Sequence, residues 1–438
     1  MCSGSSNGSS NGGGNSCSGI RSGDGKDGNN STGGGGSSSS SRSNKSKGSI
    51  SSSNDGGSGN NSGGITSSSN SGGRNSSGSS NDDDLDRKIS YDKSQLRYYI
   101  EPETPDDVCM DLREGYKDLI QKDESKKDLL DDMLRWISCH RSLFSLSIPS
   151  SKSSDSDKQH CRTSQEKLNT DFISWRGCLT RLMCTPYENR DGWLLAVTRF
   201  NDTFFLCEFN TEEKIELEAN CTDRQREMCY WGVKFEQYLT SATKESKPDT
   251  TGVVNNCEAF CSVVRTRLKS HSLVFAGEVD CICPQQKEYI ELKTSREIYN
   301  KSQDDNFKRF KLIKWWGQSF LIGVPTIVCG FRDDDGIVHR LQKYHINMLP
   351  NLAKDLPNSW YPKVCINFLD QFLNFIKETV KDNDHRSVHL FSREPKKYNN
   401  IRYQYLGKDS EYNFIPDCDH YRHRLPCLPS LGPWNIMQ

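Results

Sequence analysis

The stretch LVFAGEVDCICPQQKEYIELKT, residues 273–294, contains two apolar runs that each end in closely spaced charged residues. The first run ends in GEVD (277–280), and the second ends in ELK (291–293). Both runs are rich in β-branched and aromatic residues, and CPQQ (283–286) between them is typical of a turn. The stretch therefore predicts two adjacent strands, each with charged side chains near its end.

Alternation along a strand places Glu278 and Asp280 on one face, roughly 7 Å apart. It likewise places Glu291 and Lys293 on one face of the next strand. If the two faces coincide, three carboxylates and one ammonium group converge. Oxygen ligands without His or Cys favour Mg²⁺ or Mn²⁺ over zinc, and a neighbouring lysine can position an attacking water. The spacing indicates a metal site for phosphodiester hydrolysis; a solvated cross-strand salt bridge remains the alternative.

Two flanking segments add charged residues to this pattern. Glu236 in GVKFEQY (232–238) is a fourth acid on a helix expected over 224–239, although a simple surface charge is also compatible with its position. Lys308, Lys311 and Lys314 recur every three residues, and Gln318 follows four residues later. On a helix expected over 305–321 they form one polar ridge suited to phosphate contacts. The alternative for this ridge is an ordinary solvated helix face.

The composition divides the 438 residues into two parts. Residues 1–81 are almost entirely Ser, Gly and Asn without an aromatic residue, so we predict a disordered tail. Residues 82–438 are rich in aromatics and are expected to form one large domain, with a Ser-rich surface insertion at 147–166. The net charge of −1 does not indicate a polyanion partner, so any nucleic-acid contact must come from a local patch.

The periodicity of the remaining segments predicts an α+β fold with mixed β-sheets and flanking helices. Helices are expected over 124–146 and 365–380, a strand pair around an Asn-Asp turn over 193–209, and a second strand pair around the turn at 333–336. Residues 257–268 form either a strand or a short helix, and periodicity alone does not decide between them.

Targeting and cysteine signals are weak. The chain opens without an apolar signal segment, its longest apolar stretch (320–331) is too short to span a bilayer, and its 18 Cys follow no disulfide framework. We therefore expect a soluble intracellular protein with mostly free thiols and no membrane partner. Cys418, His420, His423 and Cys427 lack the spacing of common zinc sites, and Cys281-x-Cys283 alone is weak evidence for metal or redox chemistry.

With these residues in view, the chain resembles the DXO-type decapping exoribonuclease family over about residues 91–418. The resemblance rests on six motifs in the same order: WRG (175–177), GVKFEQY (232–238), GEVD (277–280), ELK (291–293), KWWGQSFL (314–321) and GFRDDDG (330–336). It implies one large catalytic domain with a fold related to the PD-(D/E)xK nucleases.

The resemblance also implies roles for individual residues. It implies two divalent ions, Mg²⁺ or Mn²⁺, held by Glu236, Glu278, Asp280, Glu291 and the main-chain carbonyl of Leu292. It implies that Glu278, Asp280 and Glu291 act in catalysis together with Lys293 and Gln318, which lie near the scissile phosphate. Substrate contacts are implied for Glu278, Lys293, Gln318, Asp128, Trp175, Arg176, Gly177 and Cys261. A further basic contact falls on Lys93 or Arg97, and this choice stays open.

The activity that the resemblance implies is quality control of RNA 5′ ends. Members of the family remove incomplete, unmethylated caps and NAD caps, act on 5′-triphosphate ends, and degrade RNA 5′→3′. Two alternatives stay open: a weakly catalytic or non-catalytic partner that stabilises a larger 5′→3′ exoribonuclease, and a DNA nuclease on the same fold. The expected substrates are RNAs with a free, capped or NAD-capped 5′ end. The expected location is the nucleus, with the cytoplasm as a further site.

Overall fold

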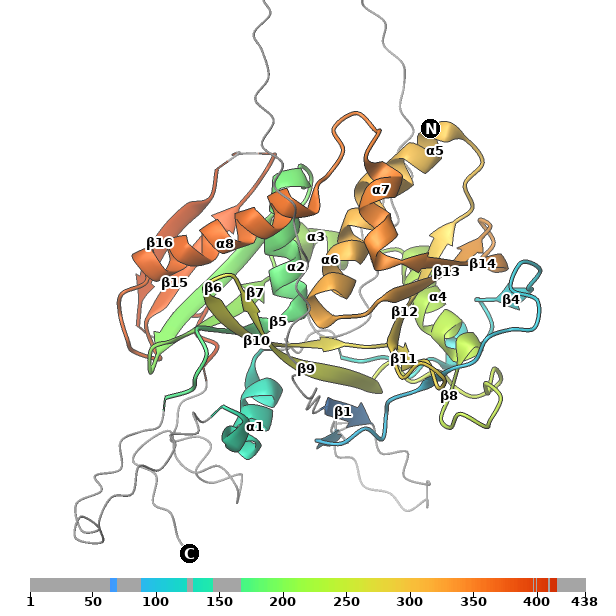
Figure 1. Cartoon of the computed structure of the whole chain (residues 1–438), viewed down its shortest axis with the longest axis horizontal. Coiled ribbons are helices and arrows are strands. Elements are labelled where there is room, and N and C mark those ends of the chain that lie inside the picture. Colours follow the sequence, from blue (N-terminus) through green and yellow to red (C-terminus); the bar gives the residue numbers. More distant parts are fainter. Residues whose placement is uncertain are drawn as a thin grey trace, which may run out of the picture.

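The computed structural model describes residues 64–68, 88–123, 129–144, 167–396, 398, 400–408 and 410–415. Strands in these segments form one sheet of nine strands and one of seven, and both sheets contain parallel and antiparallel pairs. Helices lie outside the sheets (Figure 1). The expected α+β class with mixed sheets is therefore confirmed.

The nine-stranded sheet has its most buried strand, β10, between β5 and β9. Both faces of β10 are covered, which explains its continuous apolar run in the sequence. In spatial order the strands are β16 (Arg402–Gly407), β15 (Val388–Arg393), β6 (Trp193–Phe200), β7 (Thr203–Phe209), β5 (Phe172–Trp175), β10 (His271–Glu278), β9 (Ala259–Leu268), β1 (Gly64–Ser68) and β2 (Lys88–Ser90).

The seven-stranded sheet contains the strand that carries the ELK motif, β12. Its spatial order is β4 (Met110–Asp111), β14 (Ile337–His345), β13 (Thr326–Arg332), β12 (Tyr289–Arg296), β11 (Cys281–Ile282), β3 (Tyr98–Tyr99) and β8 (Thr240–Ser241). The expected strand pair around 333–336 is β13 and β14, and the turn contains Gly336 at φ 87°. A left-handed backbone of this kind favours glycine.

Three groups of helices cover the sheets (Figure 1). Helices α2 (Arg176–Cys184), α6 (Leu312–Ile322) and α8 (Pro362–Thr379) contribute to one apolar core with β6, β7, β10 and β13. Helix α1 (Asp131–Cys139) packs on the opposite face of the nine-stranded sheet, and α4 (Asp223–Leu239) packs against β12 and β13 of the other sheet. The remaining helices are α3 (Glu212–Ala219), α5 (Lys301–Asn306) and α7 (Leu349–Ala353).

Several local predictions are confirmed by the structure. Asn201 and Asp202 have φ values of 49° and 63° and join β6 to β7 in the expected hairpin. A capping box of Thr222 and Gln225 starts α4, and α8 covers most of the late helix predicted over 365–380. Of residues 257–268, which the sequence left open, Ala259–Leu268 form strand β9, and residues 261–268 pair with β10 along its whole length.

Other predictions need correction or fall outside the described residues. Gly64–Ser68 belongs to the segment predicted as disordered, yet its backbone pairs with β9 and β2, so the prediction is wrong for these residues. The proposed insertion at 147–166 lies outside the described residues, as does the Cys/His group at 418–427. Described residues within the helix predicted over 124–146 form α1 and a short 3₁₀ turn, Arg141–Leu143.

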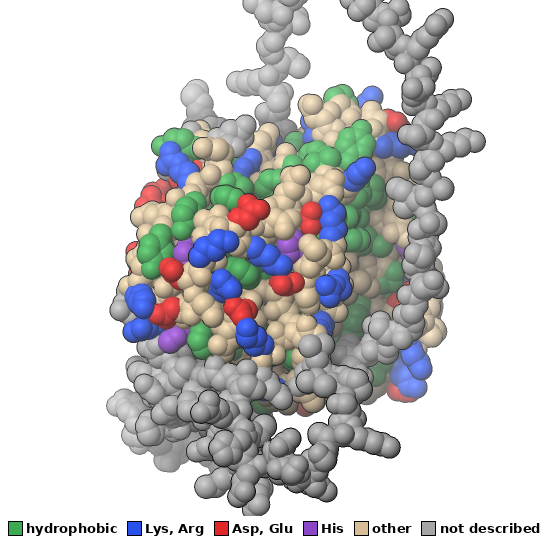
Figure 2. Space-filling view, turned by 60° about the vertical axis from the view of Figure 1, so that its left-hand side comes forward, with side chains coloured by type: hydrophobic (Ala, Val, Ile, Leu, Met, Phe, Trp, Pro, Cys, Tyr) green, Lys and Arg blue, Asp and Glu red, His purple; other side chains and the backbone are tan. Residues whose placement is uncertain are grey.

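Charges on the face near β15, β16 and α8 are of both signs (Figure 2). Several are paired there, such as Lys408 with Asp384 at 2.6 Å and Lys269 with Asp370 at 2.9 Å. Such interspersed charges agree with the near-neutral net charge of the sequence. In the described segments, no helix combines the length and the apolar character that crossing a bilayer requires.

Candidate active site at the junction of the two sheets

The stretch of residues 273–294 crosses from one sheet to the other. Strand β10 ends at Glu278 in the nine-stranded sheet, and β11 starts at Cys281 in the seven-stranded sheet. The prediction of two adjacent strands therefore holds for the last residues of the first one, Cys281 and Ile282, and is wrong for residues 273–278. It is the short β11 that forms the hairpin with β12, through the pair Cys281↔Ile290.

This crossing still brings Asp280 and Glu291 together. Since Cys281 lies opposite Ile290, the antiparallel register continues to Asp280 opposite Glu291. The Asp280 Oδ2 atom accepts a hydrogen bond of 2.6 Å from the main-chain N–H of Leu292. Asp280 directly precedes β11, and its carboxylate is turned toward the strand that carries Glu291.

Glu291 and Lys293 lie on the same face of β12 and form a close ion pair. The Lys293 Nζ atom is 2.5 Å from Glu291 Oε1, and only 2% of the Glu291 side chain is exposed. Burial opposes the charge on Lys293, but Glu291 and Asp280 outweigh it and raise the lysine pKa above its usual range. Lys293 is therefore protonated at neutral pH.

Arg176 reaches the same carboxylate from a different element. It begins α2 directly after β5, whose Trp175 pairs with Ala276 of β10, so its side chain crosses β10 at Gly277. The Arg176 Nη1 atom donates to the main-chain oxygen of Glu278 at 3.0 Å and lies 3.5 Å from Glu291 Oε2. Both oxygens of Glu291 consequently face a cation.

Gly277 is what allows Arg176 to lie there. A Cβ atom at position 277 would come within 2.7 Å of Arg176 Cβ and 2.8 Å of its Cδ. Contacts this short do not occur between real side chains, so any larger residue would displace the arginine. The glycine of the GEVD motif thus serves the arginine of the WRG motif.

The three acids have different protonation preferences. Burial and the nearby Asp280 raise the pKa of Glu278 to about 8, and burial together with Glu291 raises the pKa of Asp280 to about 6. Burial also disfavours ionised Glu291, but Lys293 and Arg176 more than compensate and lower its pKa. The site therefore contains one carboxylate stabilised by cations and two that are destabilised by burial and repulsion.

Helix α6 connects β12 to β13 and runs back along the sheet toward the start of β12. Strand β12, α6 and β13 form a parallel crossover, because Ile290 of β12 pairs with Thr326 at the start of β13. Lys311 Nζ donates to Ser295 Oγ at 3.1 Å, which fixes the helix against the far end of β12. Seven helical residues from Lys311 to Gln318 cover about 10 Å, as do three strand residues. Gln318 therefore lies nearer the start of β12 than Lys311 does.

A second glycine brings α6 close to α2. A Cβ atom at Gly317 would lie 3.1–3.3 Å from atoms of Met183, Thr180 and Cys184, so the two helices approach closely at this point. Since Thr180 is one turn after Arg176, this contact fixes the position of α6 relative to the helix that begins with Arg176.

The lysine ridge predicted on this helix does not exist. A π-helical turn, Phe307–Lys311, separates α5 from α6 and breaks the three-residue register. Lys308 pairs with Asp304 at 2.5 Å, whereas Lys314 pairs with Glu188 at 3.2 Å. Lys311 points to β12 instead, and burial lowers its pKa to about 8.

Glu236 approaches the cluster from α4. Burial raises the pKa of the Cys281 thiol, and the nearby charges of Asp280, Glu236 and Glu291 raise it further. Glu236 therefore lies near Cys281, as Asp280 and Glu291 do. The position of α4 depends on Gly330 of β13, where a Cβ atom would come within 2.4 Å of the Phe235 ring.

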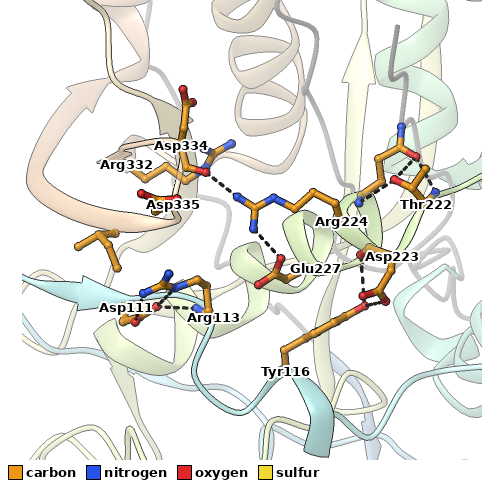
Figure 3. Close-up of polar contacts among 12 residues, drawn as sticks. Asp111, Arg113, Tyr116, Thr222, Asp223, Arg224, Glu227, Arg332, Asp334 and Asp335 are labelled. Atoms are coloured by element: carbon orange, nitrogen blue, oxygen red, sulfur yellow. Dashed lines mark hydrogen bonds and ion pairs between the residues drawn. The ribbon is translucent and has the colours of Figure 1, made fainter. Parts of the chain in front are cut away.

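The GFRDDDG turn holds the other end of α4. Arg332 and Arg224 lie over the Trp231 ring at 4.4 and 4.6 Å, and Arg224 also donates to the main-chain oxygen of Asp334 at 2.5 Å. Figure 3 shows the hydrogen bond from Arg224 to Asp334 together with the Arg224–Glu227 ion pair. The motif is thus explained by the docking of α4, a role that its sequence did not suggest.

The remaining predicted substrate residues lie at different distances from the acids. Cys261 pairs with Glu278 across β9 and β10, so it lies at the cluster. Trp175 is buried and donates its indole N–H to Leu129 O at 2.9 Å, and Gly177 is in the first turn of α2. Arg97 pairs with Glu258 at 3.2 Å, whereas Lys93 is exposed. Asp128 lies outside the described residues.

The carboxylates suit a hard divalent cation but are not yet arranged around one. Within the described part of the chain, no three Asp, Glu, His or Cys side chains surround a common point closely enough to hold a metal ion. Asp280 faces a main-chain N–H and Glu291 faces two cations. The raised pKa values of Glu278 and Asp280 nevertheless reflect buried, mutually repelling carboxylates, which a divalent ion would stabilise. Cys281 and Cys283 are both free thiols.

Comparison with known proteins agrees with this geometry. A family model described as RAI1 like PD-(D/E)XK nuclease matches residues 79–418. The human decapping and exoribonuclease protein is 39% identical over 341 residues, covering 76% of this chain and 81% of the human one.

Solved structures show the same fold. Rai1 of Scheffersomyces stipitis has 23% identity and a TM-score of 0.61, over 78% of this chain and 89% of its own. S. pombe Rai1 in complex with 3′-FADP has 27% identity and a TM-score of 0.55, over 73% of this chain and 89% of its own.

Proposed function

The chain belongs to the RAI1-like PD-(D/E)XK nuclease family, and we propose that it is a divalent-metal-dependent hydrolase of RNA 5′ ends. The observation that carries this proposal is the meeting of Glu278, Asp280 and Glu291 with Lys293 and Arg176 where the two sheets join. Two buried acids and a third that is partly buried, together with two cations, are a costly arrangement for structure alone. They are the groups that hydrolysis of a phosphodiester requires.

The metal ligands in this proposal are Glu236, Glu278, Asp280, Glu291 and the carbonyl of Leu292, with Mg²⁺ or Mn²⁺ as the ion and two ions per site. When bound, such ions polarise a phosphodiester and activate water. Lys293, protonated beside Glu291, orients the attacking group and offsets the charge of the phosphate. Gln318 on α6 positions the same phosphate by a hydrogen bond from its amide.

The substrates we propose are RNAs with incomplete caps, 5′-triphosphate ends or NAD caps, followed by 5′→3′ degradation of the body. Two names support this range: the human relative is a decapping and exoribonuclease protein, and S. pombe Rai1 binds 3′-FADP, a dinucleotide like the NAD cap. Arg176 and Cys261, beside Glu278, are the proposed contacts to the RNA end. Trp175 and Gly177 support Arg176, and Asp128 is a proposed cap contact. The proposed location is the nucleus, which imaging of a tagged protein would test.

The proposed function is tested by neutralising the acids of the site. Glu278→Gln and Asp280→Asn should each reduce hydrolysis at least a hundredfold while leaving the melting temperature close to the wild-type value, because neutral amides bind divalent ions poorly. Rates should be measured on RNAs with a 5′-monophosphate, a triphosphate, an unmethylated cap and an NAD cap. Glu297→Gln, which removes a paired acid just beyond β12, is the control and should keep full activity. Unchanged turnover by a folded double variant would contradict the proposed site.

A further inference from the structure

Arg176 and a metal ion compete for the same carboxylate. Glu291 has one oxygen 2.5 Å from Lys293 and the other 3.5 Å from Arg176, and its side chain is almost fully buried. A divalent ion that binds Glu291 is therefore repelled by both cations, so its binding is favoured when one of them moves away. The contact of Glu291 with Arg176 is longer than the one with Lys293, so it is the easier of the two to break.

The geometry around Arg176 also shows where it remains after such an exchange. Its Nη1 atom donates to Glu278 O at 3.0 Å, and this bond does not involve the Glu291 carboxylate. The side chain is held against Gly277, and its Nε atom is buried without a hydrogen-bond partner among the described residues. The guanidinium therefore stays at the site when Glu291 is taken by a metal.

We infer that Arg176 is an internal counter-ion that occupies Glu291 in the metal-free protein and is released toward the RNA phosphate when a divalent ion binds. This inference rests on the proposed metal site and adds its regulation. Glu291 is stabilised by the arginine before the ion arrives, and afterwards the freed guanidinium N–H binds an anion. Metal and RNA must then strengthen each other's binding by the same factor.

The experiment measures Mn²⁺ affinity without RNA, by titration calorimetry. Arg176→Gln removes the competing charge and should bind Mn²⁺ about tenfold more tightly than the wild type. Gly277→Ala retains every charged group but displaces the arginine, so it should shift the affinity in the same direction. Arg176→Lys, which keeps the charge without the guanidinium geometry, should fall between Arg176→Gln and the wild type.

A second readout separates this role from a merely structural one. Without metal, Arg176→Gln should lower the melting temperature because Glu291 loses a counter-ion, and saturating Mn²⁺ should reduce that deficit. Arg181→Gln on the same helix, which breaks the pair between Arg181 and Glu208 at 2.6 Å, is the control. It should lower the melting temperature without changing Mn²⁺ affinity.

The outcomes distinguish this inference from the proposed function. Unchanged or weaker Mn²⁺ binding by folded Arg176→Gln would overturn the counter-ion role of Arg176. The proposed nuclease function would be unaffected by that result. A wild-type protein that hydrolyses RNA but binds no divalent ion would overturn the proposed metal site, and the inference with it.

Discussion

Lys293 shows how one residue depends on the groups around it. Burial alone would favour its neutral form, yet Glu291 at 2.5 Å and the nearby Asp280 keep it charged. The same lysine lowers the pKa of Glu291. Neither residue would be stable at this depth without the other, so loss of either should affect both folding and hydrolysis. This coupling makes Gln318 a cleaner test of the site, because its amide carries no charge.

Replacing Gln318 should therefore affect turnover more than binding. Gln318→Ala removes the amide that we propose to contact the reacting phosphate, so we expect turnover to fall about tenfold to a hundredfold while RNA affinity changes less than threefold. Single-turnover rates and equilibrium binding of the same short 5′-monophosphate RNA provide both values. Gln342→Ala, on the outer strand β14, is the matched control and should change neither. If the loss of RNA affinity accounted for the whole loss of activity, Gln318 would contact the RNA strand away from the reacting phosphate.

At the scale of elements, α4 is positioned by two glycines of one hairpin. Gly330 leaves room for Phe235, and Gly336 leaves room for Trp231, where a Cβ atom would come within 2.8 Å of the ring. Both aromatic residues lie on the face of α4 that packs on the seven-stranded sheet, and Glu236 directly follows Phe235. The hairpin thus determines how far Glu236 reaches toward Asp280.

A methyl group at Gly330 should push α4 outward. Gly330→Ala is expected to destabilise the protein by about 1–3 kcal/mol, since overpacking a core has a cost of this order, and to weaken Mn²⁺ binding severalfold. Gly232→Ala on the same helix meets no atom within 4 Å of the added Cβ and is the control. It should stabilise the protein by up to about 1 kcal/mol through helix propensity alone. Equal Mn²⁺ affinity in both variants would show that α4 does not position a ligand.

The elements also show what the sequence could and could not predict. The hairpin of β6 and β7, helix α4 and the pair β13–β14 follow from local turn and capping signals, and all were predicted correctly. The adjacency of the GEVD and ELK strands was wrong for residues 273–278, because alternation does not encode which sheet a strand joins. The lysine ridge was wrong because a π-turn changes the register without changing the composition.

The candidate site divides along the same line. The pairing of Glu291 with Lys293 follows from the two-residue period of one strand, so the sequence suffices for it. The approach of Arg176 depends on Gly277, more than a hundred residues away in the chain, and no periodicity reveals such a contact. Family resemblance named Arg176 as a substrate contact, but its position against Glu291 became visible only in the fold.

At the scale of the whole molecule, the site lies where the chain passes from β10 in one sheet to β11 in the other. Segments from distant parts of the chain meet there. Strand β9 pairs with β10 along its length and places Cys261 opposite Glu278. On its other side β9 pairs with β1, where Ile65 lies opposite Cys261. A segment that composition assigns to a tail is thus only two strands away from the acids.

Two deletions test whether this strand contributes to the domain. Removing residues 1–63 should leave the melting temperature and turnover unchanged, because that part is nearly free of apolar residues. Removing residues 1–81 also removes β1 and leaves the backbone of β9 without that partner, so we expect the melting temperature to fall by several degrees. Turnover on a short RNA should fall a few-fold, since β9 supports Glu278.

Thermal unfolding and single-turnover rates of both truncations provide the comparison. If the two truncated proteins had the same melting temperature and turnover, β1 would add nothing to the sheet. A large fall in melting temperature on removal of residues 1–63 alone would mean that this first segment packs against the domain.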